Sequence, residues 1–215
     1  VPLDYAFLTV KAASSARVSA DEFFKSLNVS FDNPAAKCLH ELIEKMDCLL
    51  LKEESKGVRD PEVALLAAEV ADICLLRNEP EEAEIMLRRA HAIFALESGS
   101  YQLEMANVCL KIARLLIQKQ KYPEAELLLM QSMEIKNRFL GDKHIELADV
   151  LLELGYLYFC QGNYGPASGF VRAAWSILEG NCSPEKTRYV LELLIKCFEQ
   201  MGMDNECFIY REQLN

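Results

Sequence analysis

The sequence predicts an all-α protein built from stacked helix pairs. Apolar residues recur at helical spacing, Pro and Gly stand mainly at the breaks between these segments, and small residues recur at a fixed interval. Together these patterns are typical of a helical repeat protein. The chain has 215 residues and is 51% hydrophobic, so it is long enough to bury a substantial core.

Proline and glycine set the expected helix boundaries. Five prolines stand at expected first turns, where the missing N–H costs nothing, namely Pro61, Pro80, Pro123, Pro166 and Pro184. Four glycines follow apolar runs, where a residue with positive φ ends a helix, namely Gly141, Gly162, Gly180 and Gly202. The breaks predict helices at 34–55, 61–77, 80–96, 101–120, 123–139, 143–161, 166–179, 184–201 and 204–214.

The first 33 residues have no repeat assignment. Ser19-Ala20-Asp21-Glu22 has the form of a capping box. We therefore expect an N-terminal segment, 1–33, with a short helix near 20–28 docked on a repeat domain that spans 34–215.

Small residues of three consecutive helix pairs recur with a period of 42. They form the three series Ala71, Ala113 and Gly155, then Ala83, Ala125 and Ala167, then Ala90, Ser132 and Ala174. Small side chains at a helix crossing let the two axes come closer than the usual separation of about 8–10 Å. The series indicate repeat units of about 61–100, 101–142 and 143–183, followed by a partial unit at 184–215.

This placement of small residues resembles the tetratricopeptide repeat. The longer period and the segment Leu140-Gly141-Asp142-Lys143-His144 are similar to the lengthened repeats of the kinesin light chain type. The resemblance implies an α-solenoid of antiparallel helix pairs, wound as a right-handed superhelix with a concave groove lined by the first helix of each pair. HEAT and armadillo arrays also have repeats of about 40–47 residues, but the small-residue register favours the tetratricopeptide interpretation.

The resemblance also assigns groove residues. If Ala71, Ala113 and Gly155 mark the eighth repeat position, the second and third repeats offer Asn107, Leu110, Lys111, Arg114, Gln118, Asp149, Leu152, Glu153, Tyr156 and Phe159. We expect a protein partner there, a peptide or helix with an acidic residue beside an apolar anchor, because Arg pairs with carboxylates and aromatic side chains supply buried area. The alternative that residues 1–33 or another part of a parent protein cover this groove stays open.

The family's carboxylate clamp is missing from these positions. Chaperone-binding members hold a terminal carboxylate with Lys, Asn and Arg, where this chain has Ala68, Asp72, Asp149 and Glu153. A chaperone C-terminal tail is therefore not the partner that we expect.

The sequence offers no catalytic, metal or cofactor motif. His40-Glu41-Leu42-Ile43-Glu44 begins like a zincin helix but lacks the second His four residues on, and neither a glycine-rich phosphate loop nor a nucleophile elbow occurs. We expect a non-enzymatic scaffold or adaptor without metal or cofactor. The alternative is a helical accessory domain of a larger enzyme, such as a SET and MYND methyltransferase, which the start at Val1 leaves open.

The net charge and the cysteine pattern indicate which partners and which cellular compartment to expect. A net charge of −10 disfavours nucleic acid, and no apolar run reaches the roughly 18–20 residues that a membrane span needs. The eight cysteines include no C-x-x-C pair and mostly lie among apolar residues, which is typical of reduced thiols. We expect a soluble cytoplasmic protein whose oligomeric state the sequence leaves open.

Overall fold

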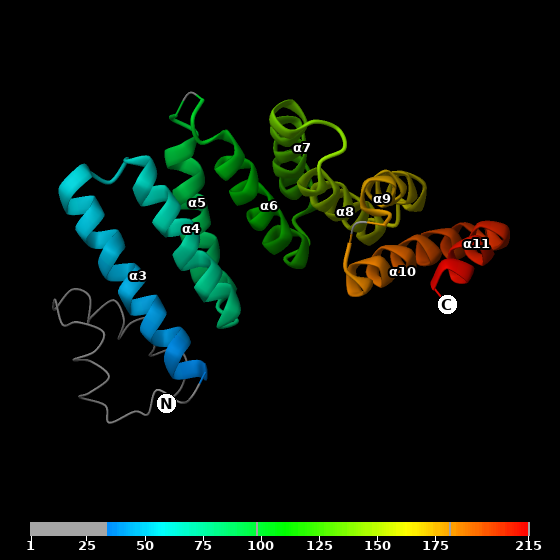
Figure 1. The fold of residues 1–215 in the computed structure, drawn as a ribbon, viewed down its shortest axis with the longest axis horizontal. Coiled ribbons are helices and arrows are strands. Elements are labelled where there is room, and N and C mark those ends of the chain that lie inside the picture. Colours follow the sequence, from blue (N-terminus) through cyan, green and yellow to red (C-terminus); the bar gives the residue numbers. More distant parts are fainter. Residues whose placement is uncertain (1–33, 98, 181, 215) are drawn as a thin grey trace. The chain divides into compact units, whose positions relative to one another are not determined.

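The computed structural model describes residues 34–97, 99–180 and 182–214, and these parts of the chain are all-α (Figure 1). The helices are α3 (Pro34–Lys56), α4 (Pro61–Leu76), α5 (Pro80–Phe94), α6 (Gln102–Gln118), α7 (Tyr122–Leu140), α8 (Ile145–Cys160), α9 (Tyr164–Leu178), α10 (Pro184–Met201) and α11 (Asp204–Leu214). Each helix predicted for 34–214 is present, with its ends within two residues of the prediction. The short helix expected near 20–28 lies outside the described residues.

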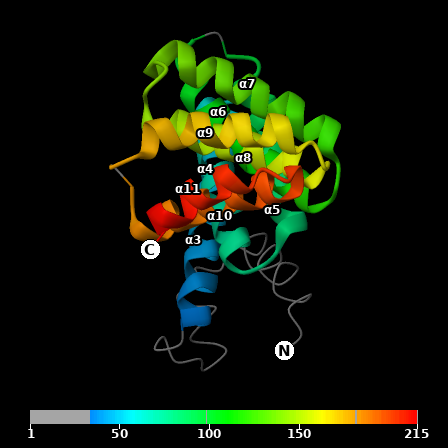
Figure 2. The same cartoon turned by 90° about the vertical axis from the view of Figure 1, so that its right-hand side faces the viewer.

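The chain divides into two compact units, Val1–Val108 and Cys109–Asn215. In the first unit, α4 packs against both α3 and α5. In the second, α8 packs against α7 and α9, and α10 packs against α9 and α11 (Figures 1 and 2). Each unit is therefore a stack in which a helix packs on its neighbours in the sequence, as in an α-solenoid.

One type of turn joins the two helices of each described pair, α4–α5, α6–α7, α8–α9 and α10–α11. The residue in the left-handed conformation is Asn78, Gln120, Gly162 or Gly202, with φ between 58° and 76°. The following amide donates to the carbonyl five residues back at 2.9–3.0 Å, in the bonds Glu79 to Cys74, Lys121 to Leu116, Asn163 to Tyr158 and Met203 to Phe198. These are Schellman turns, which satisfy the last carbonyls of the first helix.

The turns also give the true spacing of the repeats. Asn78, Gln120 and Gly162 follow one another with the period of 42, whereas Gly202 follows Gly162 by 40. Stacked ring pairs show the same shorter step, because Tyr158 stacks on Phe170 at 5.4 Å and Phe198 on Tyr210 at 5.7 Å. The last helix pair is therefore a repeat in a register shifted by two residues.

The small residues that define the repeats are all buried. The nine are Ala71, Ala83, Ala90, Ala113, Ala125, Ser132, Gly155, Ala167 and Ala174. At Gly155, a Cβ atom would lie 2.4 Å from Val171 Cγ2 and 3.3 Å from the carbonyl oxygen of Ala167. Helices α8 and α9 thus cross at a distance that leaves no space for a side chain at this position.

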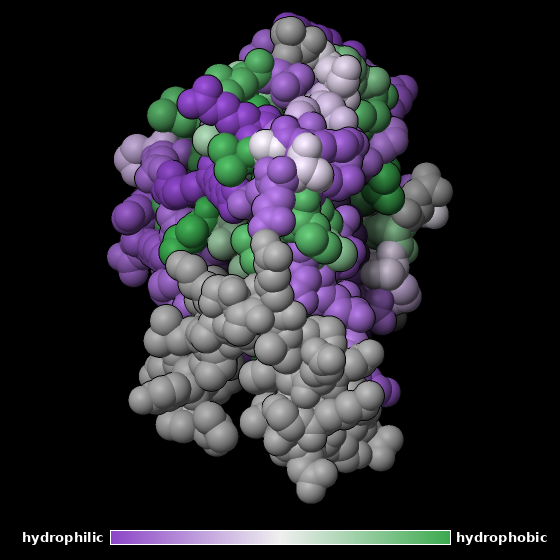
Figure 3. All heavy atoms as spheres, turned by 90° about the vertical axis from the view of Figure 1, so that its left-hand side faces the viewer, coloured by the Kyte–Doolittle hydropathy of each residue, from purple (hydrophilic) through white to green (hydrophobic). Residues whose placement is uncertain are grey.

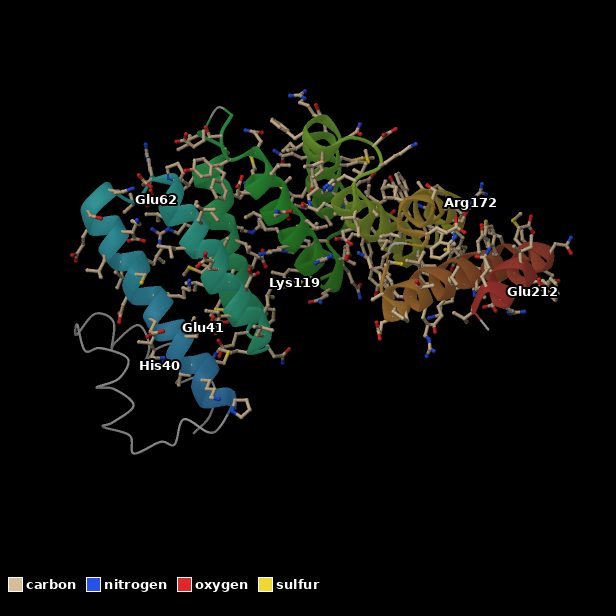
Figure 4. All side chains as sticks on the ribbon, in the orientation of Figure 1. His40, Glu41, Glu62, Lys119, Arg172 and Glu212 are labelled. Atoms are coloured by element: carbon tan, nitrogen blue, oxygen red, sulfur yellow. The ribbon has the colours of Figure 1, made fainter. Side chains whose placement is uncertain are left out.

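Ion pairs link the C-terminal part of one helix to the first turn of the next at two places. Glu62 in the first turn of α4 accepts from Lys52 and from Lys56 of α3, the latter at 2.5 Å (Figure 4). In the second unit, Lys136 Nζ of α7 lies 3.1 Å from Glu146 Oε2 of α8. Glu62 and Glu146 each stand two residues after the N-cap of their helix, which is Asp60 in α4 and His144 in α8.

The visible surface is mainly hydrophilic. In the face shown in Figure 3, hydrophobic side chains form separate groups among hydrophilic ones. Scattered exposed apolar residues such as Leu51 and Val58 are ordinary on a folded protein. Within the described ranges, no helix is both long and apolar enough to cross a membrane.

Candidate binding surface

The predicted groove residues do not all share one unit. Asn107 belongs to the first unit and the other nine to the second, where they lie on α6 and α8. Two of the nine need correction as lining residues, because Leu110 and Leu152 are only 6% and 5% exposed. Their side chains pack in the interior and offer almost no accessible surface.

Arg114 and Glu153 join α6 to α8. Arg114 Nε donates to Glu153 Oε1 at 2.8 Å, and the Arg114 side chain remains about half exposed. An exposed pair of this kind contributes about 0.2–1 kcal/mol to stability. Its main effect is to hold the guanidinium group in place on the surface.

A second ion pair joins α8 to α10. Asp149 accepts a hydrogen bond from Lys186 in the first turn of α10, and both side chains are about one-third exposed. Asp149 is a predicted groove residue, whereas its partner Lys186 is not. Three successive first helices of the pairs, α6, α8 and α10, are thus connected by charge pairs.

Two tyrosines stand beside these pairs. Tyr156 of α8 is 38% exposed and Tyr189 of α10 is 46% exposed. The hydrogen bond of Tyr156 to Cys160, with the nearby Glu153 carboxylate as a lesser cause, raises the pKa of Tyr156. Partial burial, followed by the charge of Glu153, raises the pKa of Tyr189 to about 12. Both phenols are therefore neutral hydrogen-bonding groups at physiological pH.

We call Arg114, Asp149, Glu153, Tyr156, Lys186 and Tyr189 the A-helix surface. It combines two exposed aromatic rings with two internally neutralised ion pairs. Such a surface can bury a partner's apolar side chain against the rings and exchange hydrogen bonds at the pairs.

Three further predicted residues lie at the margin of this surface. Gln118 is exposed at the end of α6, and Lys111 is partly buried one turn before Arg114. Phe159 is partly buried, with its ring 5.5 Å from that of Tyr164 in an edge-on arrangement. It packs against the core around α8 and α9, so it supports the surface more than it extends it.

Lys186 and Tyr189 on α10 are not predicted by the period of 42, under which 184–215 is only a partial repeat. With the observed step of 40, Tyr189 is equivalent to Asp149, one of the predicted groove residues. Gly162 and Gly202, both recognised as helix-ending residues, already carried this shorter spacing.

No metal centre emerges from the described residues. Among them, no three His, Cys, Asp or Glu side chains are grouped to hold a metal ion. His40 and Glu41 lie near the start of α3 (Figure 4), where His40 Nδ1 is 3.7 Å from Glu44. Burial raises the pKa of the Cys74 and Cys109 thiols to about 12 and that of Cys197 to about 11, so these thiols stay protonated.

The stacked helix pairs and the surface on their first helices are those of an α-solenoid with tetratricopeptide-like repeats. Residues 103–179 match the family model described as tetratricopeptide repeat. The recognition of tetratricopeptide-like repeats from the sequence is confirmed. No curated protein sequence matches the chain.

Solved structures share the fold at low sequence identity. BtubC (BKLC) from P. vanneervenii is 15% identical with a TM-score of 0.68, over 100% of this chain and 90% of that one. A Podosopora anserina putative kinesin light chain with nearly identical TPR-like repeats is 16% identical with a TM-score of 0.68, over 94% and 93%. The apo form of RapI is 16% identical with a TM-score of 0.63, over 99% and 74%. At such identities the likeness shows the fold alone.

Proposed function

We propose that this chain is a non-enzymatic interaction scaffold or adaptor that binds a peptide or helix of a partner protein on the A-helix surface. The observation that carries the proposal is the placement of two exposed tyrosines, Tyr156 and Tyr189, beside the Arg114–Glu153 pair. Repeat arrays of this architecture offer extended surfaces for binding.

Aromatic residues and arginine supply most of the binding energy at protein interfaces. Tyr156 and Tyr189 expose ring area while their hydroxyl groups stay neutral, so both can pack against an apolar side chain and donate a hydrogen bond. We therefore propose an apolar or aromatic anchor of the partner between α8 and α10.

The ion pair of Arg114 suggests which charged group the partner carries. Arg114 contacts Glu153 through Nε, and an end-on bidentate bond through its two terminal nitrogens is compatible with that contact. We propose that a partner carboxylate binds Arg114 in this way, next to the apolar anchor. Glu153 then acts as an orienting group for the guanidinium.

A peptide library selected on the purified 215-residue chain tests this proposal. We expect the recovered peptides to combine an acidic residue with an aromatic or aliphatic one a few positions away. Arg114→Gln should weaken their binding by about 1–3 kcal/mol, which is a loss of about 5- to 150-fold in affinity. Titration calorimetry measures the change.

Arg138 provides the matched control. It lies on α7 outside the A-helix surface and pairs with Glu134 at 3.3 Å, with both side chains largely exposed. Arg138→Gln should leave peptide affinity unchanged. Equal affinity of wild-type and Arg114→Gln protein, or peptides without acidic residues, would contradict the carboxylate contact. Equal affinity of a Tyr156→Ala, Tyr189→Ala variant would contradict the surface itself.

We also propose a reducing, cytoplasmic setting for this scaffold. All eight cysteines are free thiols, and Cys74, Cys109, Cys197 and Cys207 are buried. Fractionation of cells that express the tagged chain, followed by thiol labelling, tests this proposal. Oxidised cysteines or recovery outside the cytosol would contradict it.

A further inference from the structure

The first turn of α8 is capped by a histidine side chain. His144 Nδ1 accepts a hydrogen bond from the backbone N–H of Glu146 at 3.3 Å, and the backbone of His144 is extended, with φ of −76° and ψ of 139°. Two repeat periods earlier, the equivalent position before α4 holds Asp60, whose carboxylate accepts from the amide of Glu62 at 2.8 Å. The two caps share one geometry but differ in the acceptor, which is an imidazole in α8 and a carboxylate in α4.

An imidazole can accept this hydrogen bond only while it is neutral. Nδ1 has a free lone pair in the tautomer that carries its proton on Nε2, whereas both ring nitrogens are donors in the cation. Histidine side chains gain their proton between about pH 8 and 5. Since His144 is the only histidine of the second unit, acidification over this range acts in that unit on the cap of α8.

Charged groups of α7, of α8 and of the segment between them surround this cap. The Glu146 carboxylate lies 3.1 Å from the ammonium group of Lys136 on α7, whose side chain is only 2% exposed. Asp142 and Lys143 directly precede the cap in the chain. Glu146 therefore has two roles at this place, because its amide needs the cap and its carboxylate neutralises a buried ammonium group.

Helices α9 and α10, which also pack against α8, add further charges. Glu179 follows the last residue of α9, at the end of the helix pair where α8 begins. Lys186 of α10 is held by Asp149, which lies little more than one turn beyond the cap. The carboxylates around the cap attract an imidazolium and the lysines repel it. A proton can therefore enter this site, and the neighbouring ion pair then meets an additional positive charge.

We propose that His144 is a pH-sensitive cap that loosens the joint between α7 and α8 in mild acid, the joint being residues 141–144 together with the Lys136–Glu146 pair. Protonation removes the acceptor for the Glu146 amide and places a positive charge at the positive end of the α8 dipole. The imidazolium also competes with the Lys136 ammonium group for the Glu146 carboxylate. The equivalent joint between α3 and α4 keeps its cap, because the carboxylate of Asp60 accepts hydrogen bonds throughout this range.

Amide hydrogen exchange of the full 215-residue chain tests this proposal, with each rate divided by the rate of an unstructured peptide at the same pH. Protection of the Glu146 amide should fall by about fivefold between about pH 7.5 and about pH 5.5, the ratio that corresponds to a cap of about 1 kcal/mol. The Glu62 amide of α4, which Asp60 caps, is the internal control and should keep its protection.

Two variants of the cap complete the experiment. Asn accepts the capping bond at either pH, so His144→Asn should show the same protection of the Glu146 amide at both. Ala cannot cap, so His144→Ala should show low protection at the higher pH and no further fall at the lower one. Equal protection of the wild-type amide at the two pH values would overturn the proposal. An equal loss of protection in the His144→Asn protein would overturn it as well.

Discussion

Lys136 and Glu146 form the same contact, ten residues apart along the chain, as Lys52 and Glu62. The lysines lie near the ends of α3 and α7, and each glutamate lies in the first turn of the next helix. Two repeat periods separate the two ion pairs in the sequence. Between them, the equivalent position holds Phe94, which stacks on Tyr101 at 5.7 Å.

Lys136 occupies a position that is apolar in neighbouring repeats, since Phe94 and Leu178 are its equivalents. We expect Lys136→Met to change the free energy of unfolding by less than about 1 kcal/mol, because the packed aliphatic stem is retained. Glu146→Ala should destabilise by about 1–3 kcal/mol, because it leaves a buried ammonium group unpaired. Urea unfolding of both variants measures the difference, and a larger loss for Lys136→Met would contradict this account.

Gly155 and Gly169 form a matched pair within helices. A Cβ atom at Gly155 would meet Val171 at 2.4 Å, whereas at Gly169 it would have no neighbour within 4 Å. We expect Gly155→Ala to destabilise by about 1–3 kcal/mol through overpacking. Gly169→Ala should stabilise by about 0.5–1 kcal/mol through helix propensity. Thermal unfolding monitored by circular dichroism reports both, and shifts of equal sign would refute the assigned crossing.

Glu62 should make stability depend on acid pH. Hydrogen bonds from Lys52 and Lys56 lower the pKa of Glu62 from 4.5 to about 2. A carboxyl group with a lowered folded-state pKa contributes stability above its unfolded pKa and loses it as pH falls through the folded value. The melting temperature of wild type should therefore exceed that of Glu62→Gln at pH 7, and the difference should vanish between about pH 4.5 and 2. A constant difference across this range would rule out the pairing as its cause.

Gln120 adopts a left-handed conformation, with φ of 58°, that strains a residue with an unbranched side chain. Gln120→Gly should relieve this strain and stabilise the protein by about 0.5–1 kcal/mol. Asn78→Gly, at the equivalent turn, should give a smaller gain because Asn tolerates this region. Denaturant midpoints of the two variants provide the test, and a loss of stability in Gln120→Gly would contradict the Schellman geometry.

Most of the fold was predictable because residues that start and end helices recur at regular positions in the sequence. Pro61 and Pro184 stand at helix starts, and Gly162 and Gly202 have the positive φ that their positions after apolar runs indicated. Asn78 and Gln120 adopt the same turn without a glycine to indicate it in the sequence. The two-residue shift of the last repeat was not predicted, because the repeats were aligned on Ala and Gly positions and α10 and α11 contain no matching series of small residues.

The candidate surface was predictable only in part. Repeat position alone predicts Arg114, Glu153 and Tyr156 as groove residues, and they lie on α6 and α8, with Arg114 paired to Glu153. The pairing of Arg114 with Glu153 joins residues 39 positions apart, and no local pattern encodes it. Burial of Leu110 and Leu152 likewise depends on how neighbouring helices approach, which the repeat pattern does not specify.

The two equivalent lysines differ in their access to water, since Lys52 is 35% exposed and Lys136 only 2%. Dissolved ions screen exposed charges strongly and buried ones weakly. Rising ionic strength should therefore loosen the joint between α3 and α4 while the joint between α7 and α8 keeps its strength. One shared geometry thus gives a salt-sensitive connection between α3 and α4 and a salt-resistant one between α7 and α8.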